Sequence, residues 1–140
     1  MNSALEFHDS VLFEIRREEG AAVFVLRPAY VHKSTGEPGV DEGTGWSLDL
    51  EVFLWDAALS FEGGEPNLPA RISDGRLDVG DRAGDNVVPL PLASRESASM
   101  VLDLETGQRI SVYAKGIESR ELGEATFIER FPGGPRGPVA

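Results

Sequence analysis

The sequence predicts a single all-β domain with few or no helices, and two features of its pattern carry this prediction. Turn-forming residues recur about every ten to fifteen positions, and the runs between them alternate apolar with polar side chains, which is typical of short antiparallel strands. No helical spacing is sustained anywhere in the chain. We therefore expect strands at residues 10–17, 21–31, 44–60, 68–73, 76–80, 86–92, 98–104, 108–117 and 123–131.

Length and composition set the size of the domain. The chain has 140 residues, of which 41% are hydrophobic, and it contains no cysteine. A domain of this length buries enough surface to fold without a disulfide or a metal ion. We expect one domain over residues 1–131. Residues 132–140 contain three Pro and three Gly and too few apolar anchors, so they are expected to form a flexible tail.

Two of the early strands have special features. In the stretch 21–31, Pro28 lacks a backbone donor and predicts a sheet edge or a bulge. In the stretch 44–60, alternate residues from Trp46 to Leu54 are apolar, and Phe53 and Trp55 make the second face apolar as well. This strand should be amphipathic at first and buried on both faces later, with a bend or a change of sheet near Val52.

Two hairpins follow from register, because partners across antiparallel strands share a face. A two-residue Asp74-Gly75 turn would pair Ile72 with Leu77, and Asp-Gly is favoured in type I′ turns.

Around Gly107 the same test favours a three-residue loop, 105–107. This loop sets Leu102 opposite Ile110 and Asp103 opposite Arg109, with Gly107 in the left-handed position.

A sheet with one apolar face has to cover that face. Without predicted helices the cover is a second sheet or the same sheet closed on itself. The sequence therefore predicts an antiparallel β-sandwich or barrel of about eight to nine strands.

The charge balance limits the partners. The formal net charge is −11, which disfavours nucleic acids and anionic membranes, since both are bound by covering phosphates with Lys and Arg. The start of the chain lacks a basic segment followed by an apolar run, and no stretch is apolar enough to span a membrane. We expect a cytoplasmic protein.

The middle of the chain is the strongest candidate for a binding surface. Residues 34–70 contain eight acidic residues and no Lys or Arg. One hypothesis is a negative face that steers a basic partner, with Phe53 or Trp55 as a partly exposed anchor. The other is a solvated surface that keeps the protein soluble. The residues proposed for partner binding are Asp41, Glu42, Asp49, Glu51, Phe53, Trp55 and Asp56.

No catalytic or metal site is predicted. His8, Asp9 and Ser10 are the residue types of a hydrolase triad, but neighbours on an extended chain point to opposite faces. With two histidines and no cysteine, no His-rich or thiolate metal site is expected, and neither is a cofactor. The alternative role for His8 and Asp9 is to line a pocket with Trp46 at one end of the domain, where a small ligand or a carbohydrate would bind.

Several segments resemble a group of small bacterial β-proteins. These segments are Phe7-His8-Asp9-Ser10 before an alternating strand, the Asp74-Gly75 dipeptide, NVVPLPL at 86–92, the 103–109 hairpin and GEATFIERF at 123–131. The group has no settled activity, and some similar acidic proteins are suspected immunity partners of bacterial toxins. The resemblance implies an all-β fold and no catalytic residues.

Taken together, these features predict a non-enzymatic protein-interaction module with an acidic face, in one version an immunity-type inhibitor of a basic toxin. The alternatives are a small-ligand or carbohydrate binder and a scaffolding homodimer formed by edge pairing.

Overall fold

The computed structural model describes residues 1–133, and these form antiparallel strands without a helix. The all-β prediction is confirmed. None of the described residues belongs to a helix with the length and apolar character needed to cross a membrane. The strands are β1 (Asn2–Glu6), β2 (Val11–Glu18), β3 (Ala21–Ser34), β4 (Gly43–Trp55), β5 (Ala58–Glu62), β6 (Ala70–Val79), β7 (Arg82–Asp85), β8 (Val87–Leu90), β9 (Ala93–Ser94), β10 (Ala98–Leu104), β11 (Arg109–Ala114) and β12 (Gly116–Phe131).

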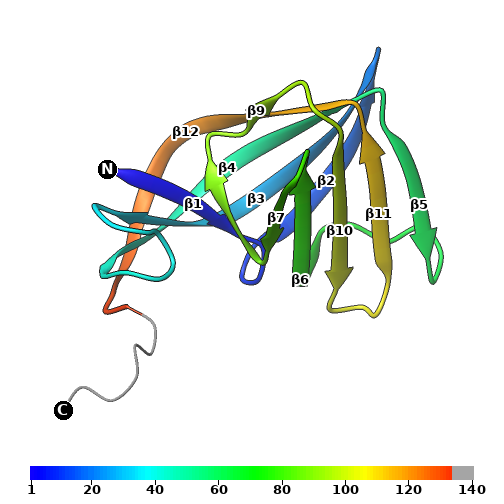
Figure 1. The fold of residues 1–140 in the computed structure, drawn as a ribbon. Helices are drawn as coiled ribbons and strands as arrows, with labels where there is room; N and C mark the ends of the chain where they lie inside the picture. The colour runs from blue at the N-terminus through cyan, green and yellow to red at the C-terminus, as the bar shows by residue number, and fades with distance from the viewer. Residues whose placement is uncertain (134–140) are drawn as a thin grey trace.

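All twelve strands belong to one sheet, ordered β5-β11-β10-β6-β2-β3-β4-β12-β9, with β1, β7 and β8 attached beside this path (Figure 1). The sheet is not closed. The structure therefore has an open sheet with more strands than the eight or nine expected, and neither a closed barrel nor two separate sheets is observed.

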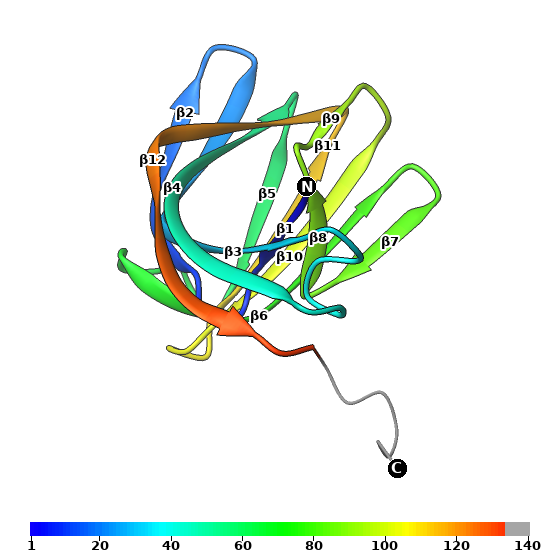
Figure 2. The same cartoon turned by 90° about the vertical axis from the view of Figure 1, so that its left-hand side faces the viewer.

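The open sheet covers its apolar face by curling around one core. In Figure 2, β4 and β12 arc around one side of the molecule while β5, β10 and β11 stand on the other. Buried side chains from both sides, such as Phe24 and Leu50 on one and Met100 and Ile110 on the other, belong to the same cluster. By curling, the sheet buries its apolar face against itself, as a second sheet would bury that face in a sandwich.

Strand β3 is the centre of the curled part. One of its edges pairs with β4, and its other edge pairs first with β2 and then with β1. The change of partner falls at Pro28, where the register with β4 shifts between Leu26 and Ala29. The predicted bulge at Pro28 is confirmed, although the strand is interior. Strand β1, which holds β3 beyond the bulge, was not expected from the sequence.

The predicted strand 44–60 is two strands, β4 and β5. The residues of β4 from Leu50 to Leu54 are all buried, which confirms that its second half is covered on both faces. The chain leaves β4 at Asp56, whose φ of 49° lies in the left-handed region, so the change to the other part of the sheet comes there and not near Val52.

The register predicted for the 105–107 hairpin is confirmed. Leu102 pairs with Ile110, Asp103 pairs with Arg109, and Gly107 has a φ of 91°. The Arg109 guanidinium donates to Asp103 at 2.7 Å, so the expected opposite-charge pair forms.

The predicted Asp74-Gly75 turn is wrong. Strand β6 runs straight through both residues, and Gly75 pairs with Leu102 of β10. A Cβ on Gly75 would collide with the ring of Phe7, which is itself buried. The glycine is thus required by close packing and not by a turn, a distinction that local preference cannot make.

The chain ends in one long strand. Residues 118–122 were expected to separate two strands, but β12 is continuous across them, with register shifts after Leu122 and after Phe127. Most of the predicted tail lies outside the described residues.

Replacement of Gly75 with Ala tests the packing against Phe7. Since the φ of Gly75 is not positive, the added methyl group acts through its clash alone, and we expect a loss of about 1–3 kcal/mol in the free energy of unfolding. Urea denaturation measures it. In a Phe7→Ala background the same substitution should cost much less, and an equal cost in both backgrounds would contradict the packing account.

Candidate binding cavity

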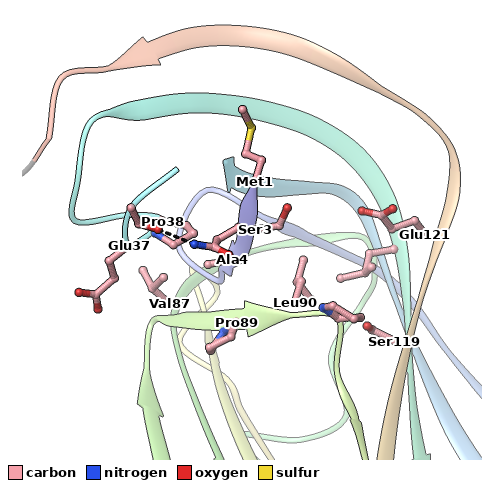
Figure 3. Close-up of a pocket in the computed structure, with 14 residues that line it drawn as sticks. Met1, Ser3, Ala4, Glu37, Pro38, Val87, Pro89, Leu90, Ser119 and Glu121 are labelled. Atoms are coloured by element: carbon pink, nitrogen blue, oxygen red, sulfur yellow. Dashed lines mark hydrogen bonds between the residues drawn. The ribbon is translucent and has the colours of Figure 1, made fainter. Parts of the chain in front are cut away.

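A hollow lies between β1, β8, β12 and the loop that follows β3. Its volume is about 900 Å³. Figure 3 shows β1 entering the cavity, with Glu37 on one side and Glu121 on the other. The lining residues are mostly apolar and include neither Lys nor Arg: Met1, Asn2, Ser3, Ala4, Gly36, Glu37, Pro38, Leu50, Val87, Pro89, Leu90, Pro91, Ser119 and Glu121.

The inward face of β12 changes character as it reaches the cavity. Ile117, Ser119 and Glu121 alternate along one face, and their partners on β4 are the buried residues Leu54, Val52 and Leu50. Side chains two apart on a strand share a face. Glu121 therefore projects a carboxylate from the core side of the sheet into the hollow, where a core residue would otherwise be expected.

The loop at the mouth of the cavity is held by its own hydrogen bonds. The Ser34 hydroxyl donates to the carbonyl of Glu42 at 2.7 Å and accepts from the amide of Gly36 at 3.0 Å. The Asp41 carboxylate accepts from the amide of Glu37 at 2.6 Å, and the Asn2 side chain donates to the carbonyl of Gly36 at 2.8 Å. Glu37 is thus positioned on a braced loop.

A polar cluster on the opposite face of the sheet fastens β1, β3 and β12 together. His32 is 3% exposed and its Nε2 lies 3.0 Å from the Glu6 carboxylate. The rings of Tyr30 and Phe131 pack edge-on against it. The Tyr30 hydroxyl donates to Glu129 at 2.7 Å. Burial, together with this bond, raises the pKa of Tyr30 above its ordinary value of 10.0.

The residues predicted for partner binding do not form one acidic face. Glu51 is 7% exposed and bonds to Arg16, whose pKa is raised chiefly by this contact, and the expectation that it is available at the surface is wrong. Asp49 pairs with Arg27 at 3.1 Å. Strand β4 carries Asp49 and Glu51 on the convex face of the curled sheet, which is the face that points away from the main core. Arginines of neighbouring strands reach them there.

The two aromatic candidates on this convex face, Phe53 and Trp55, differ in their exposure to solvent. Phe53 is buried beside Val23 and Val25, and Arg120 lies over its ring at 4.9 Å. Trp55 stacks on Phe53 and is 41% exposed, so of the two proposed anchors it is the exposed one.

The remaining candidates lie in turns. Asp56 is exposed at the turn between β4 and β5, and its amide donates to the carbonyl of Gly20. Asp41 and Glu42 lie in the loop that also supplies Glu37 to the cavity.

The residues proposed for the alternative pocket are not brought together. His8 and Asp9 are exposed in the turn after β1, where the His8 ring lies 3.0 Å from the carbonyl of Ser73. Trp46 lies on β4 and packs against Phe127. None of the three lines the cavity. Ser10, by contrast, is fully buried and ties the turn to Glu6 and Tyr30 through its hydroxyl.

Sequence reasoning missed Glu37 and Glu121 as site residues. The signal for Glu121 was the alternation Ile117, Ser119, Glu121, which continues one strand face into polar residues. Within residues 1–133, no group of three or more His, Asp or Glu side chains is arranged to hold a metal ion.

Comparisons with known proteins found no match: no family model, no curated protein and no solved structure is similar to the chain. The resemblance to small bacterial β-proteins stays a prediction.

The convex-face ion pairs give a stability prediction. Glu51→Gln should lower the free energy of unfolding by about 1–3 kcal/mol, because Glu51 is a buried partner of Arg16. Asp49→Asn removes a solvent-exposed partner of Arg27 and should cost no more than about 0.5–1 kcal/mol. Chemical denaturation of both variants measures the two losses in the free energy of unfolding. Equal losses would show that burial does not distinguish the two ion pairs.

The raised pKa of Tyr30 gives a pH prediction. Because folding favours the protonated phenol, its contribution to stability is complete below pH 10.0 and is lost as the pH rises above that value. Absorbance of tyrosinate in the native protein should show a late-ionising phenol that is missing in Tyr30→Phe. A titration curve unchanged by this substitution would contradict the burial of the hydroxyl group.

Proposed function

We propose that this protein is a non-enzymatic binding module that holds a cationic group of a basic partner protein in the cavity between β1, β8 and β12. The observation that carries the proposal is the carboxylate of Glu121, which projects from the core side of β12 into a largely apolar hollow lined by no Lys or Arg of the described residues. Glu121 forms no ion pair with another described residue, and a carboxylate beside apolar surface is matched best by a cation on an apolar stem.

The surroundings support the same class of partner. Glu37 stands on the far side of β1 from Glu121 with its carboxylate directed outward, and Asp41 and Glu42 follow it in the same loop, so this loop adds negative charge around the mouth of the cavity. A net charge of −11 adds attraction at long range for a basic surface. The acidic surface proposed for binding is therefore this loop together with Glu121, while Asp49 and Glu51 are paired within the chain.

Arginine fits the cavity better than lysine. Its planar guanidinium can bond a carboxylate through two donors at once, and its three methylene groups can lie along Leu90, which shares the core face with Glu121. In the immunity-type version of the proposal, the partner is a basic toxin that presents such an arginine, and binding blocks the basic surface of the toxin.

A second function is favoured by the size of the cavity. A volume of about 900 Å³ lies within the range of sites that enclose small ligands. The same lining would then select a small amphipathic cation. Thermal unfolding in the presence of phenethylamine tests this version, and stabilisation that is lost in Glu121→Gln would support it over a protein partner.

A selection with a displayed library of random peptides tests the main proposal on the full chain. The enriched peptides should contain Arg or Lys, and their binding should weaken as salt rises. Glu121→Gln keeps the shape of the side chain and removes its charge, so we expect about a tenfold increase in Kd, equivalent to about 1.4 kcal/mol.

The matched control is Glu124→Gln, which removes an exposed carboxylate of the same strand that does not line the cavity. Its Kd should stay close to that of the unaltered protein. Enrichment of acidic or neutral peptides, or equal effects of the two substitutions, would overturn the proposal.

A further inference from the structure

The concave face that carries Glu121 continues beyond the cavity into an aromatic pair. Trp46 and Phe127 face each other across β4 and β12, with ring centroids 5.5 Å apart in an edge-on arrangement. Trp46 alternates along β4 with Leu48 and Leu50, and Leu50 lines the cavity, so the pair lies on the same face as the cavity. Phe127 is 51% exposed, which is unusual for a phenylalanine on the core side of a sheet.

The outer edge of β12 has no strand beside it over most of its length. Strand β9 pairs with this edge at Ile117 and Glu118, and the amide of Ser119 bonds to Leu92. From residue 120 to residue 131, no strand of the described chain pairs with the edge opposite β4. Figure 2 shows this part of β12 on the outside of the molecule. An unpaired edge offers backbone donors and acceptors to an added strand.

The register fixes the spacing between the two features. Glu121 pairs with Leu50 and Phe127 pairs with Trp46, and these β4 residues are four positions apart, whereas Glu121 and Phe127 are six apart because β12 bulges between Leu122 and Thr126. Four residues of a strand span about 13 Å. A strand added to the edge of β12 presents every second side chain to the concave face, so its residues i and i+4 can reach Phe127 and Glu121.

The charge of Lys33 indicates which of the two features, Glu121 or the aromatic pair, binds the cation of the partner. Its Nζ lies 4.8 Å from the centroid of the Trp46 ring, so the aromatic pair already has a positive charge on it. A cation of the partner is repelled there and attracted to Glu121. The aromatic pair is left for an apolar side chain.

We propose that the partner binds as an extended segment that pairs antiparallel to the free edge of β12, with a large apolar residue on Phe127 and an arginine four positions later at Glu121. This inference rests on the proposed function and adds the form of the partner, its direction and its spacing. Antiparallel pairing is the commoner choice, and it sets the apolar residue before the arginine.

Two peptides of the same composition test the spacing against the full-length protein by calorimetry. In Thr-Phe-Thr-Val-Thr-Arg-Thr the phenylalanine and the arginine are four apart and share a face. In Thr-Phe-Val-Thr-Arg-Thr-Thr they are three apart and point to opposite faces. We expect the first peptide to bind at least tenfold tighter, and Phe127→Ser to remove this preference.

Ile128→Ser is the matched control, because it removes a similarly exposed apolar side chain from the neighbouring position, and it should leave the preference unchanged. If both peptides bind alike and Glu121→Gln weakens both, the proposed function stands and the extended-segment inference fails. If neither peptide binds, the inference is overturned. It would also be overturned by light scattering that shows a dimer dissociated by Phe127→Ser, because a second copy would then occupy the edge.

Discussion

The architecture depends on one constraint: within the described residues, another strand pairs with the outer edge of β12 only at Ile117 and Glu118. The chain that could have continued this pairing contains Pro89 and Pro91, which lack backbone donors, and β8 pairs instead with β1. The sheet therefore stays open beside β12. The cavity lies at this opening, and it is the reason that Glu121 and Phe127 can be polar or exposed on a face that elsewhere forms the core.

The distribution of charge follows from the two faces of the curled sheet. On the convex face, Arg16 and Arg27 pair with Glu51 and Asp49, and Arg120 covers Phe53. The two carboxylates that β4 carries on that face are thus paired with arginines of the same chain. At the opening of the sheet the cavity lining includes Glu37 and Glu121 and no Lys or Arg side chain among the described residues. An acidic sequence thus becomes a localised acidic site only through the way in which the strands are paired.

The sequence could predict what depends on neighbours along the chain. The 105–107 hairpin was predicted with its register because both strands and the turn residue Gly107 are local. The Asp74-Gly75 turn failed because a distant ring, that of Phe7, determines why a glycine is there. Likewise, nothing near Glu51 in the sequence shows that Arg16 would bury it.

The site was less predictable than the fold. Ser119 and Glu121 look like a break between strands, since polar residues at inward positions contradict the alternation expected of a core strand. Only the pairing of β12 with β4 shows that they lie on the concave face. Such local conflicts with the pattern are where functional positions are expected.

The central claim is that the outer edge of β12 is open, and amide hydrogen exchange of the free protein measures this most directly. Along β12 beyond Ser119, amides that point toward β4 should be protected, while those that point away should exchange close to the rate of an unstructured peptide. Protection of both sets to the same degree would mean that the edge is covered, and would contradict the account.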